Sequence, residues 1–433
     1  MNKKMLAISV VAVLVIAGLG AWFVYFGQES DSDGDDGTDN GSRVGTELVN
    51  ETFPSDASRL WVYGNADEDD HIDDDDVEFL EDIIDGDETA TVLADANCDG
   101  EIDDDDVDYV EDIIEGKEMK VYYVDNYDQI AVVNWPVDTI ATGYCSGAQA
   151  VEVAGATDKI AIADNYITQY YTAFNSSYAS LPSYGEPDEP DYEALIAAGI
   201  DVYLIGYFNS GTDDLLEENL NPAGIDVMFL TCCDQSGVNQ PNEDMDRTML
   251  MIAYLIQGDM DKAYDYLTWH DSILANVTAA AATISDADQK TFLMSRTSPN
   301  DKTSDITITG YNNINNIHAE IAGVYSIGMH DSGLTNMYQT ISVEYIIGLD
   351  ADYYCDNTHA GFRYGGGANS SARLATFLQQ DHTRFEGTTY DPELIAMARE
   401  AGNGPMYVLE IVFYQDVMYP ELDNGLSSYE VLF

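Results

Sequence analysis

The longest helical pattern in the sequence spans residues 259–284. Mostly apolar side chains recur there every three or four positions, a spacing that places them on one face of an α-helix. This stripe consists of Met260, Ala263, Leu267, His270, Leu274 and Val277. Asp259 suits the N-cap position, and Gly258 ends a preceding helical pattern over residues 247–257. At about 1.5 Å per residue, the pattern predicts a helix roughly 40 Å long.

Short apolar runs alternate with helical stretches on both sides of this helix. Before it, residues 120–124 and 130–133 have the pattern of strands, residues 138–164 that of a helix followed by a strand, and further helix and strand patterns run to residue 232. After it, we expect a strand at 290–295, helices beginning at 314 and 340, and a final strand at 402–411. Such alternation is typical of a mainly parallel sheet. One large α/β domain and two lobes joined by the long helix are both compatible with it.

An acidic segment is duplicated near the N-terminus, at residues 64–86 and 94–116. The two copies are offset by 30 residues and share IDDDDV and EDII. Each fits a calcium loop of the EF-hand type, which places oxygen ligands at loop positions 1, 3, 5, 7, 9 and 12. The predicted ligands are Asn65, Asp67, Asp69, the His71 carbonyl, Asp73 and Asp76 in the first loop, and Asp95, Asn97, Asp99, the Glu101 carbonyl, Asp103 and Asp106 in the second.

The sixth position of each loop requires a sharp turn. Gly100 occupies it in the second loop and Asp70 in the first. Asp tolerates a left-handed conformation better than most residues, so we expect a weaker first loop. The duplicated segment (residues 60–118) resembles dockerin modules, which carry Asp at position 12. This resemblance implies two calcium ions and a cohesin-like partner, although calcium could simply fold a small domain of mutually repelling carboxylates.

The first residues have the pattern of a membrane segment. A basic patch at residues 1–4 precedes 22 mostly apolar residues (5–26), which is long enough to span a bilayer with the N-terminus in the cytoplasm. A cleaved signal peptide is the alternative, since residues 17–21 are small. Either interpretation makes the rest of the chain extracytoplasmic. Residues 28–49 are rich in Asp, Gly and Ser, which is typical of a disordered tether.

Charge narrows the choice of partners. The 433 residues include 16 basic and 80 acidic ones, for a formal net charge of −64. Nucleic acids and anionic membrane surfaces would repel such a chain. Divalent cations, a cationic partner or a saline habitat, such as an archaeal surface, suit it. The odd number of cysteines, five, argues against a disulfide framework or a zinc site.

Several pieces of the α/β part occur in a familiar order. They are the strand before Pro136, the stretch 154–160, the helix–strand units at 192–205 and 342–354, and the stretch 419–422. Together they resemble the substrate-binding proteins of ABC importers for iron complexes and corrinoids, the class with a rigid inter-lobe helix. The resemblance covers residues 121–433. The usual Pro-Asp before the third strand of each lobe is Ile200-Asp201 and Ala351-Asp352 here, so only the Asp remains.

The resemblance implies an α/β fold of two Rossmann-like lobes joined by one long helix, preceded by the all-α dockerin-like module. The expected domains are an anchor or signal peptide at 1–27, an acidic tether at 28–58, the calcium module at 59–118, an N-terminal lobe at 119–242, an inter-lobe helical segment at 243–286 and a C-terminal lobe at 287–433. A stiff connector predicts a small closing motion of the lobes.

Ligands of open α/β sheets bind beyond the carboxyl ends of the strands. The candidate ligand-binding residues in those loops are Tyr144, Ser146, Tyr207, Phe208, Arg296, His359, Arg363 and Tyr364. Arg296 and Arg363 could bind carboxylates of an iron chelate or a corrinoid phosphate, or could form salt bridges with nearby acids. The resemblance further implies that Glu193 and Glu344 pair with arginines of the membrane permease. The alternative is that both are ordinary exposed helix glutamates.

We recognise no catalytic motif, so we expect a binding protein and no enzyme. The leading hypothesis is a membrane-tethered solute-binding protein that delivers an iron chelate (a siderophore complex, for example), haem or a corrinoid such as cobalamin to an ABC permease and ATPase. The alternative is a calcium-dependent surface assembly or adhesion protein of the dockerin type. A third hypothesis is an extracellular hydrolase whose motif is not evident.

Overall fold

The computed structural model describes residues 58–169, 171–173, 175–206, 213–230, 232, 243–296, 305–358, 370–398, 404–422 and 425–426. The predicted anchor at 1–27 and the tether, except for Ser58, lie outside these ranges. In the described part of the chain, none of the helices combines the length and the apolar character needed to cross a membrane.

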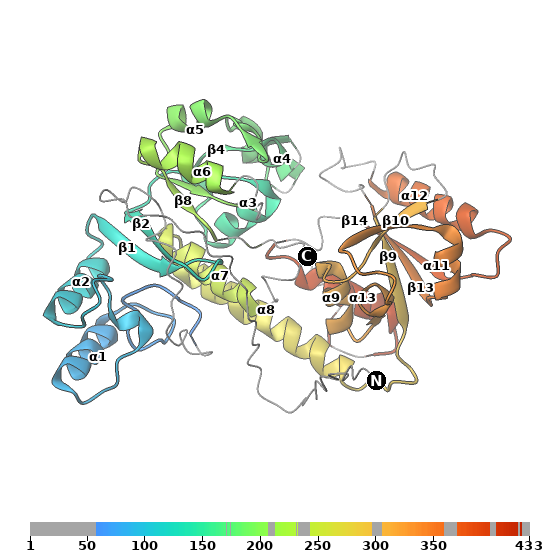
Figure 1. Ribbon diagram of the computed structural model, residues 1–433, viewed down its shortest axis with the longest axis horizontal. Helices are drawn as coiled ribbons and strands as arrows, with labels where there is room; N and C mark the ends of the chain where they lie inside the picture. The colour runs from blue at the N-terminus through green and yellow to red at the C-terminus, as the bar shows by residue number, and fades with distance from the viewer. Residues whose placement is uncertain are drawn as a thin grey trace, which may run out of the picture. The chain divides into compact units, whose positions relative to one another are not determined.

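The duplicated acidic segment forms two helices, α1 (Asp74–Asp85) and α2 (Asp104–Ile114), with a 3-10 turn at Val92–Ala94 between them (Figure 1). Each helix begins with a capping box. The N-cap Asp side chain accepts from the backbone N–H three residues later, and the Asp side chain of that later residue accepts from the backbone N–H of the N-cap. The N-caps are Asp73 and Asp103. Leu80 and Val110 are fully buried between the two copies.

A two-stranded hairpin follows the acidic module, formed by β1 (Met119–Val124) and β2 (Ile130–Trp135). The segment before the first calcium loop adds to β1: the N–H of Val124 donates to the Trp61 carbonyl at 3.0 Å, and Val62 pairs with Tyr123. The apolar core is continuous from Leu60 into the following α/β lobe. The module and the lobe are therefore packed together.

The N-terminal lobe is built on a four-stranded, fully parallel sheet of order β4-β3-β7-β8. Its strands are β3 (Ile140–Thr142), β4 (Ile160–Ala163), β7 (Val202–Leu204) and β8 (Asp226–Met228), and a small hairpin pairs β5 (Gly185–Glu186) with β6 (Glu189–Pro190). Its helices are α3 (Tyr144–Val153), α4 (Asn165–Gln169), α5 (Tyr192–Ala198) and α6 (Asp213–Leu220). Short 3-10 turns lie at Thr157–Lys159, Tyr171–Ala173, Ser176–Ser180 and Asn221–Ala223.

Both faces of this sheet are covered, as continuous apolar strands require. Tyr203 packs with helices α5 and α6 on one face. Its neighbours Val202 and Leu204 point into the core formed with α3 and the helices that follow the lobe. The prediction of a mainly parallel sheet is confirmed here. The residues predicted to begin a helix at 138 instead include strand β3.

The predicted long helix is present as α8 (Met260–Ala281), 22 residues long and preceded by α7 (Glu243–Leu255). The Asp259 side chain caps it by accepting from the backbone N–H of Lys262. The buried residues of α8 are Ala263, Leu267, His270, Ile273 and Val277. The predicted stripe is thus buried except for Met260 and Leu274, which are half-buried. Helix α7, which precedes α8 in the chain, packs on α8. Helix α13 (Val408–Met418), near the C-terminal end of the chain, also packs on it.

The C-terminal lobe is built on a mixed sheet of order β12-β10-β9-β13-β14, with β11 beside β9. Its strands are β9 (Thr291–Ser295), β10 (Asp305–Thr309), β11 (Tyr325–Ser326), β12 (Tyr338–Ser342), β13 (Tyr353–Thr358) and β14 (Glu393–Ala398). Its helices are α9 (Ile314–Ile321), α10 (Ile327–His330), α11 (Val343–Leu349) and α12 (Ser370–Phe385), besides α13. Strands β9, β11, β13 and β14 run parallel, whereas β10 is antiparallel to both neighbours.

Two expectations for this lobe are wrong. The final strand expected at 402–411 is not present in its described residues, 404–411: β14 is the last strand described, and residues 408–418 form helix α13. The run VLEIVFY is apolar on every side, and such a run does not distinguish a strand from a fully buried helix. The helix expected from residue 340 begins only at Val343, because Tyr338–Ser342 pairs with β10 as strand β12.

The two lobes repeat one local unit. Helices α5 and α11 each have seven residues, follow a side-chain N-cap (Asp191 or Ser342) and end in a left-handed residue. Two residues after that left-handed residue, an Asp side chain accepts hydrogen bonds from a Thr where the neighbouring strand begins. Asp201 accepts from the N–H and hydroxyl of Thr139, at 2.7 and 2.9 Å, and Asp352 accepts from the same two groups of Thr291, both at 2.9 Å. The Asp that remains from the Pro-Asp pattern thus has the same structural role in both lobes.

Candidate ligand-binding edges and calcium loops

The carboxyl ends of β3, β4, β7 and β8 meet at one edge of the N-terminal sheet, because these strands are parallel. Gly206, after β7, approaches the Gly143 carbonyl so closely that a Cβ atom would lie 1.6 Å from it. This contact requires glycine. Tyr144 follows Gly143 and begins α3 in a left-handed conformation, with φ of 56°.

The predicted ligand residue Tyr144 is fixed in place at this edge. Its N–H donates to Asp164 at 2.7 Å, its hydroxyl donates to Asp188 at 2.8 Å, and its ring stacks on Tyr166 with 5.6 Å between centroids. Burial, with a smaller contribution from the Asp188 carboxylate, raises the pKa of the phenol above its usual value. Tyr144 therefore stays neutral at ordinary pH and offers an aromatic surface.

Ser146 lies two residues further along α3 and is buried. Its hydroxyl donates to the Gly206 carbonyl at 2.6 Å, so its proton is already engaged within the lobe. Contact of Ser146 with a ligand stays a prediction, with its oxygen left as an acceptor. The predicted neighbours Tyr207 and Phe208 lie outside the described residues.

At the C-terminal sheet, the equivalent edge is formed by the ends of β9, β13 and β14. Arg296 directly follows β9, as expected, and is half-buried. Its guanidinium carbon lies 4.6 Å from the centroid of the Tyr338 ring. The cation–π interaction at this distance holds the charged guanidinium in position. His359, Arg363 and Tyr364 follow β13 but lie outside the described residues.

A buried polar network at this edge was not predicted from the sequence. Asn357, in β13, donates to Asn315 of α9 at 3.2 Å. Asn315 donates to both carboxylate oxygens of Glu410, which also lies 2.7 Å from His318 and accepts from the Tyr414 hydroxyl. Glu410 is fully buried. The signal that could have revealed it is a single acid inside an otherwise apolar run.

Glu193 and Glu344 occupy matching positions in the repeated unit. Both are exposed in the first turn of their helices, α5 and α11. A carboxylate in a first turn is favoured by the helix dipole, so this position by itself explains a glutamate there. Docking of these two residues to a permease stays a prediction.

The two predicted calcium loops share one backbone geometry. The last acid of each loop accepts from the N–H of loop positions 3 and 9: Asp76 at 3.2 and 2.8 Å, and Asp106 at 3.1 and 3.0 Å. The sixth position is left-handed in both, with φ of 81° at Asp70 and 92° at Gly100. The two sixth positions therefore share a left-handed conformation, although the first has no glycine.

The loop carboxylates are crowded with like charges. Burial, and to a smaller extent Asp67, raises the pKa of Asp76 to about 7, against the effect of its backbone hydrogen bonds. Burial also raises the pKa of Asp67, Asp95 and Asp106. The donor set is entirely oxygen, which fits a hard cation such as calcium. Assignment of the twelve loop ligands stays a prediction.

In the described part of the chain, one set of three His and Asp ligand atoms gathers within 4.8 Å, and it lies outside the loops: Asp246, His270 and Asp271. His270 is buried, 2.8 Å from Asp246 through Nδ1 and 2.7 Å from the Tyr407 hydroxyl through Nε2. Arg59 lies 3.3 Å from Asp271. The guanidinium already supplies a positive charge, so we interpret this set as a polar contact between elements.

Comparison with known proteins gives the fold. No protein-family model matches the sequence, and neither does any curated protein. Among solved structures, the TroA-like periplasmic binding protein FepB of Veillonella parvula matches with a TM-score of 0.57 at 13% identity, over 72% of this chain and 93% of its own. The fold is similar to that of TroA-like periplasmic binding proteins.

Two further structures match over comparable lengths. Molybdate-bound MolA of Haemophilus influenzae, the periplasmic binding protein of an ABC transporter, gives a TM-score of 0.56 at 13% identity, over 72% of this chain and 94% of its own. Nickel-bound CeuE of Helicobacter pylori gives 0.52 at 14% identity, over 73% and 96%. At such low identity these matches concern the fold.

Proposed function

We propose that this chain is an extracytoplasmic substrate-binding protein of an ABC importer, tethered to the membrane by its N-terminal segment. The observation that carries the proposal is the architecture: two α/β sheets, each ending in a loop edge, joined through the long helix α8. This is the fold of periplasmic binding proteins, and of MolA in particular, which serves an ABC transporter. Glu193 and Glu344 would contact the permease, which works with an ATPase.

We infer that the ligand is an iron chelate, haem or a corrinoid. The N-terminal edge offers the stacked rings of Tyr144 and Tyr166, which suit a flat or aromatic ligand. The C-terminal edge offers the Arg296 guanidinium, which suits carboxylate or phosphate groups. A bare transition metal would want several His and acidic ligands converging at an edge. Among the described residues, the acids at these edges are already hydrogen-bonded within the protein: Asp164 and Asp188 to Tyr144, and Glu410 to Asn315.

We further propose that the two acidic loops bind calcium, through the ligands Asn65 to Asp76 and Asp95 to Asp106 predicted above. When bound, calcium would neutralise carboxylates that otherwise repel one another. Both loops have a capping box and a left-handed sixth position, and these shared features support one calcium ion in each loop. Docking to a cohesin-like partner is the alternative role for this module.

The ligand class is testable by thermal unfolding of the full chain with haem, a ferric siderophore, cobalamin, nickel and molybdate. A ligand at 100 times its dissociation constant stabilises by about 2.7 kcal/mol. With an unfolding entropy of about 2.1 cal/mol/K per residue, we expect the melting temperature of a chain of this length to rise by roughly 3 °C. Arg296→Gln should weaken an anionic ligand about tenfold, whereas Lys117→Gln, a control on the exposed surface of the calcium module, should not. Lack of a shift with every probe would remove the support for an importer ligand of this class.

Calcium binding is testable by calorimetry on the full chain. We expect two bound ions, and one after Asp99→Ala combined with Asp106→Ala, because both replaced carboxylates are ligands of the second loop. Asp104→Ala with Asp108→Ala removes the same charge from exposed, non-ligand positions and should leave two. Unchanged stoichiometry in the ligand variant would contradict the assignment.

A further inference from the structure

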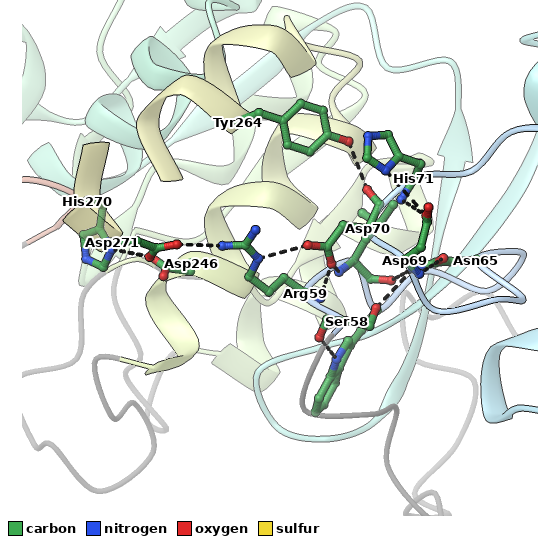
Figure 2. Close-up of polar contacts among 12 residues, drawn as sticks. Ser58, Arg59, Asn65, Asp69, Asp70, His71, Asp246, Tyr264, His270 and Asp271 are labelled. Carbon is green, nitrogen blue, oxygen red and sulfur yellow. Dashed lines mark hydrogen bonds and ion pairs between the residues drawn. The ribbon is translucent and has the colours of Figure 1, made fainter. Parts of the chain in front are cut away.

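The first predicted calcium loop is held against the inter-lobe helix α8 (Figure 2). Its sixth residue, Asp70, accepts through its side chain from the backbone N–H groups of Arg59 and Leu60 and from Nε of Arg59 at 3.0 Å. The Asp70 carbonyl accepts from the hydroxyl of Tyr264, on α8, at 3.0 Å. The side chain and the carbonyl of Asp70 are therefore both hydrogen-bonded to groups outside the loop.

Two further contacts complete this connection, which we call the loop-helix clamp and define as Arg59, Asp70, His71, Tyr264 and Asp271. The His71 ring stacks on Tyr264, with 5.0 Å between centroids. Arg59 lies 3.3 Å from Asp271. Tyr264 and Asp271 are seven residues apart on α8, so they present to the loop from one face of the helix.

The second loop provides the comparison. Its sixth and seventh residues, Gly100 and Glu101, are exposed, and the hydrogen bonds that the structure gives their N–H groups go to Asp95 and Asp99 of the same loop. The two copies thus share a backbone geometry but differ in what surrounds their outer turn. The difference lies at the position where Asp70 replaces glycine.

Asp70 is an unfavourable residue for its conformation. A left-handed backbone costs a non-glycine residue roughly 1–2 kcal/mol, although Asp bears it better than most. Its charge-assisted hydrogen bonds to Arg59 offset that cost. Burial alone would lower the pKa of Arg59, but Asp70 and Asp271 raise it, so the guanidinium keeps its charge.

Scarce positive charge is concentrated at this contact. The chain has only 16 basic residues, and two of them lie here: Arg59 in the clamp, and Arg247 of α7, whose guanidinium carbon is 3.8 Å from the centroid of the Trp61 ring. In a chain with 80 acidic residues, this placement favours contact between the acidic module and the helices α7 and α8.

We propose that calcium binding in the first loop is coupled to the stability of α8 through the loop-helix clamp, so that the helix joining the lobes is stiffened by calcium. The inference rests on the proposed calcium sites. Asp70 lies between two predicted oxygen ligands, the Asp69 carboxylate and the His71 carbonyl. Fixing residue 70 on α8 pre-organises both ligands, and by linkage the bound ion holds the loop in the shape that contacts α8.

Hydrogen exchange of the full chain, with and without calcium, tests the coupling. We expect calcium to slow exchange of backbone amides in residues 260–281 at least tenfold. Asp70→Gly restores the usual loop residue and should keep two calcium ions by calorimetry, but it should abolish the calcium effect on α8. Tyr264→Phe should reduce that effect with unchanged stoichiometry. Tyr345→Phe, a matched loss of an exposed hydroxyl bonded to Asp331 at 2.7 Å, should not alter it.

The outcomes separate the coupling from the calcium sites themselves. If calcium binds to the wild type but α8 exchanges at the same rate, or if Asp70→Gly and Tyr264→Phe both keep the full effect, the coupling is overturned and the calcium sites stand. If calorimetry detects no calcium binding to the wild type, the calcium sites are overturned and the coupling with them. Should Asp70→Gly fail to fold, Tyr264→Phe still decides between these results.

Discussion

Replacing Glu410 by Ala is expected to lower the free energy of unfolding by about 3–5 kcal/mol. Glu410 is fully buried in α13 and accepts from Asn315 at 2.9 and 3.0 Å. It also lies 2.7 Å from His318, in the same lobe. Removing the carboxylate leaves these buried polar groups without their acceptor, which costs more than the hydrogen bonds themselves contribute.

Urea unfolding of the full chain measures this loss. Glu410→Gln keeps the volume and one acceptor, so its cost should be smaller than that of Glu410→Ala. Glu386→Ala removes an exposed glutamate after α12 and should change the free energy of unfolding by less than about 0.5 kcal/mol. Equal effects of Glu410→Ala and Glu386→Ala would show that the network contributes nothing to stability.

A second large effect is expected from Asp381, as a dependence of stability on pH. Asp381 of α12 is buried beside Asp356 of β13, also buried. Burial, followed by the charge of Asp356, raises the pKa of Asp381 to about 8, although Arg384 acts in the opposite direction. The folded chain therefore retains a proton that the unfolded chain loses near pH 4.

The sign follows from proton linkage. Between about pH 4 and about pH 8 the folded state binds the extra proton, so the contribution of Asp381 to stability falls as pH rises, by up to about 1.4 kcal/mol per pH unit. Asp381→Asn removes this dependence. The stability of the variant relative to wild type should rise steadily from pH 5 to pH 8 in urea unfolding. Asp391→Asn, at an exposed position, should show a constant difference, and a constant difference for Asp381→Asn would refute the prediction.

Helices of both lobes pack on α8, and this packing bears on how a ligand would be sensed. The buried stripe of α8 extends over most of the length of that helix, from Ala263 to Val277. Helix α13, which carries Glu410, packs on the same helix. A helix held along its length favours the small closing motion expected of a stiff connector, and the loop-helix clamp would add calcium as a further support.

The features that the sequence predicted correctly depend on local periodicity and chain direction. The stripe of α8 and its Asp259 cap follow from 3.6-residue spacing and N-cap chemistry. Helices α1 and α2 follow from the acidic segment duplicated at a 30-residue offset, which predicted a small all-α module. Because parallel strands bring their carboxyl ends to one edge, the positions of Tyr144 and Arg296 beyond β3 and β9 could also be predicted.

Tertiary structure decided what local pattern leaves open. The apolar run at 408–418 is compatible with strand or helix, and its burial against α8 and α9 made it α13. Strand β12 forms because β10 lies beside it, a partner that no local pattern specifies. Glu410 with Asn315 is a pair 95 residues apart, and Asp70 with Tyr264 is a pair 194 residues apart. Periodicity reports which face of an element is apolar, whereas the partner of a buried charge is set only when distant segments pack together.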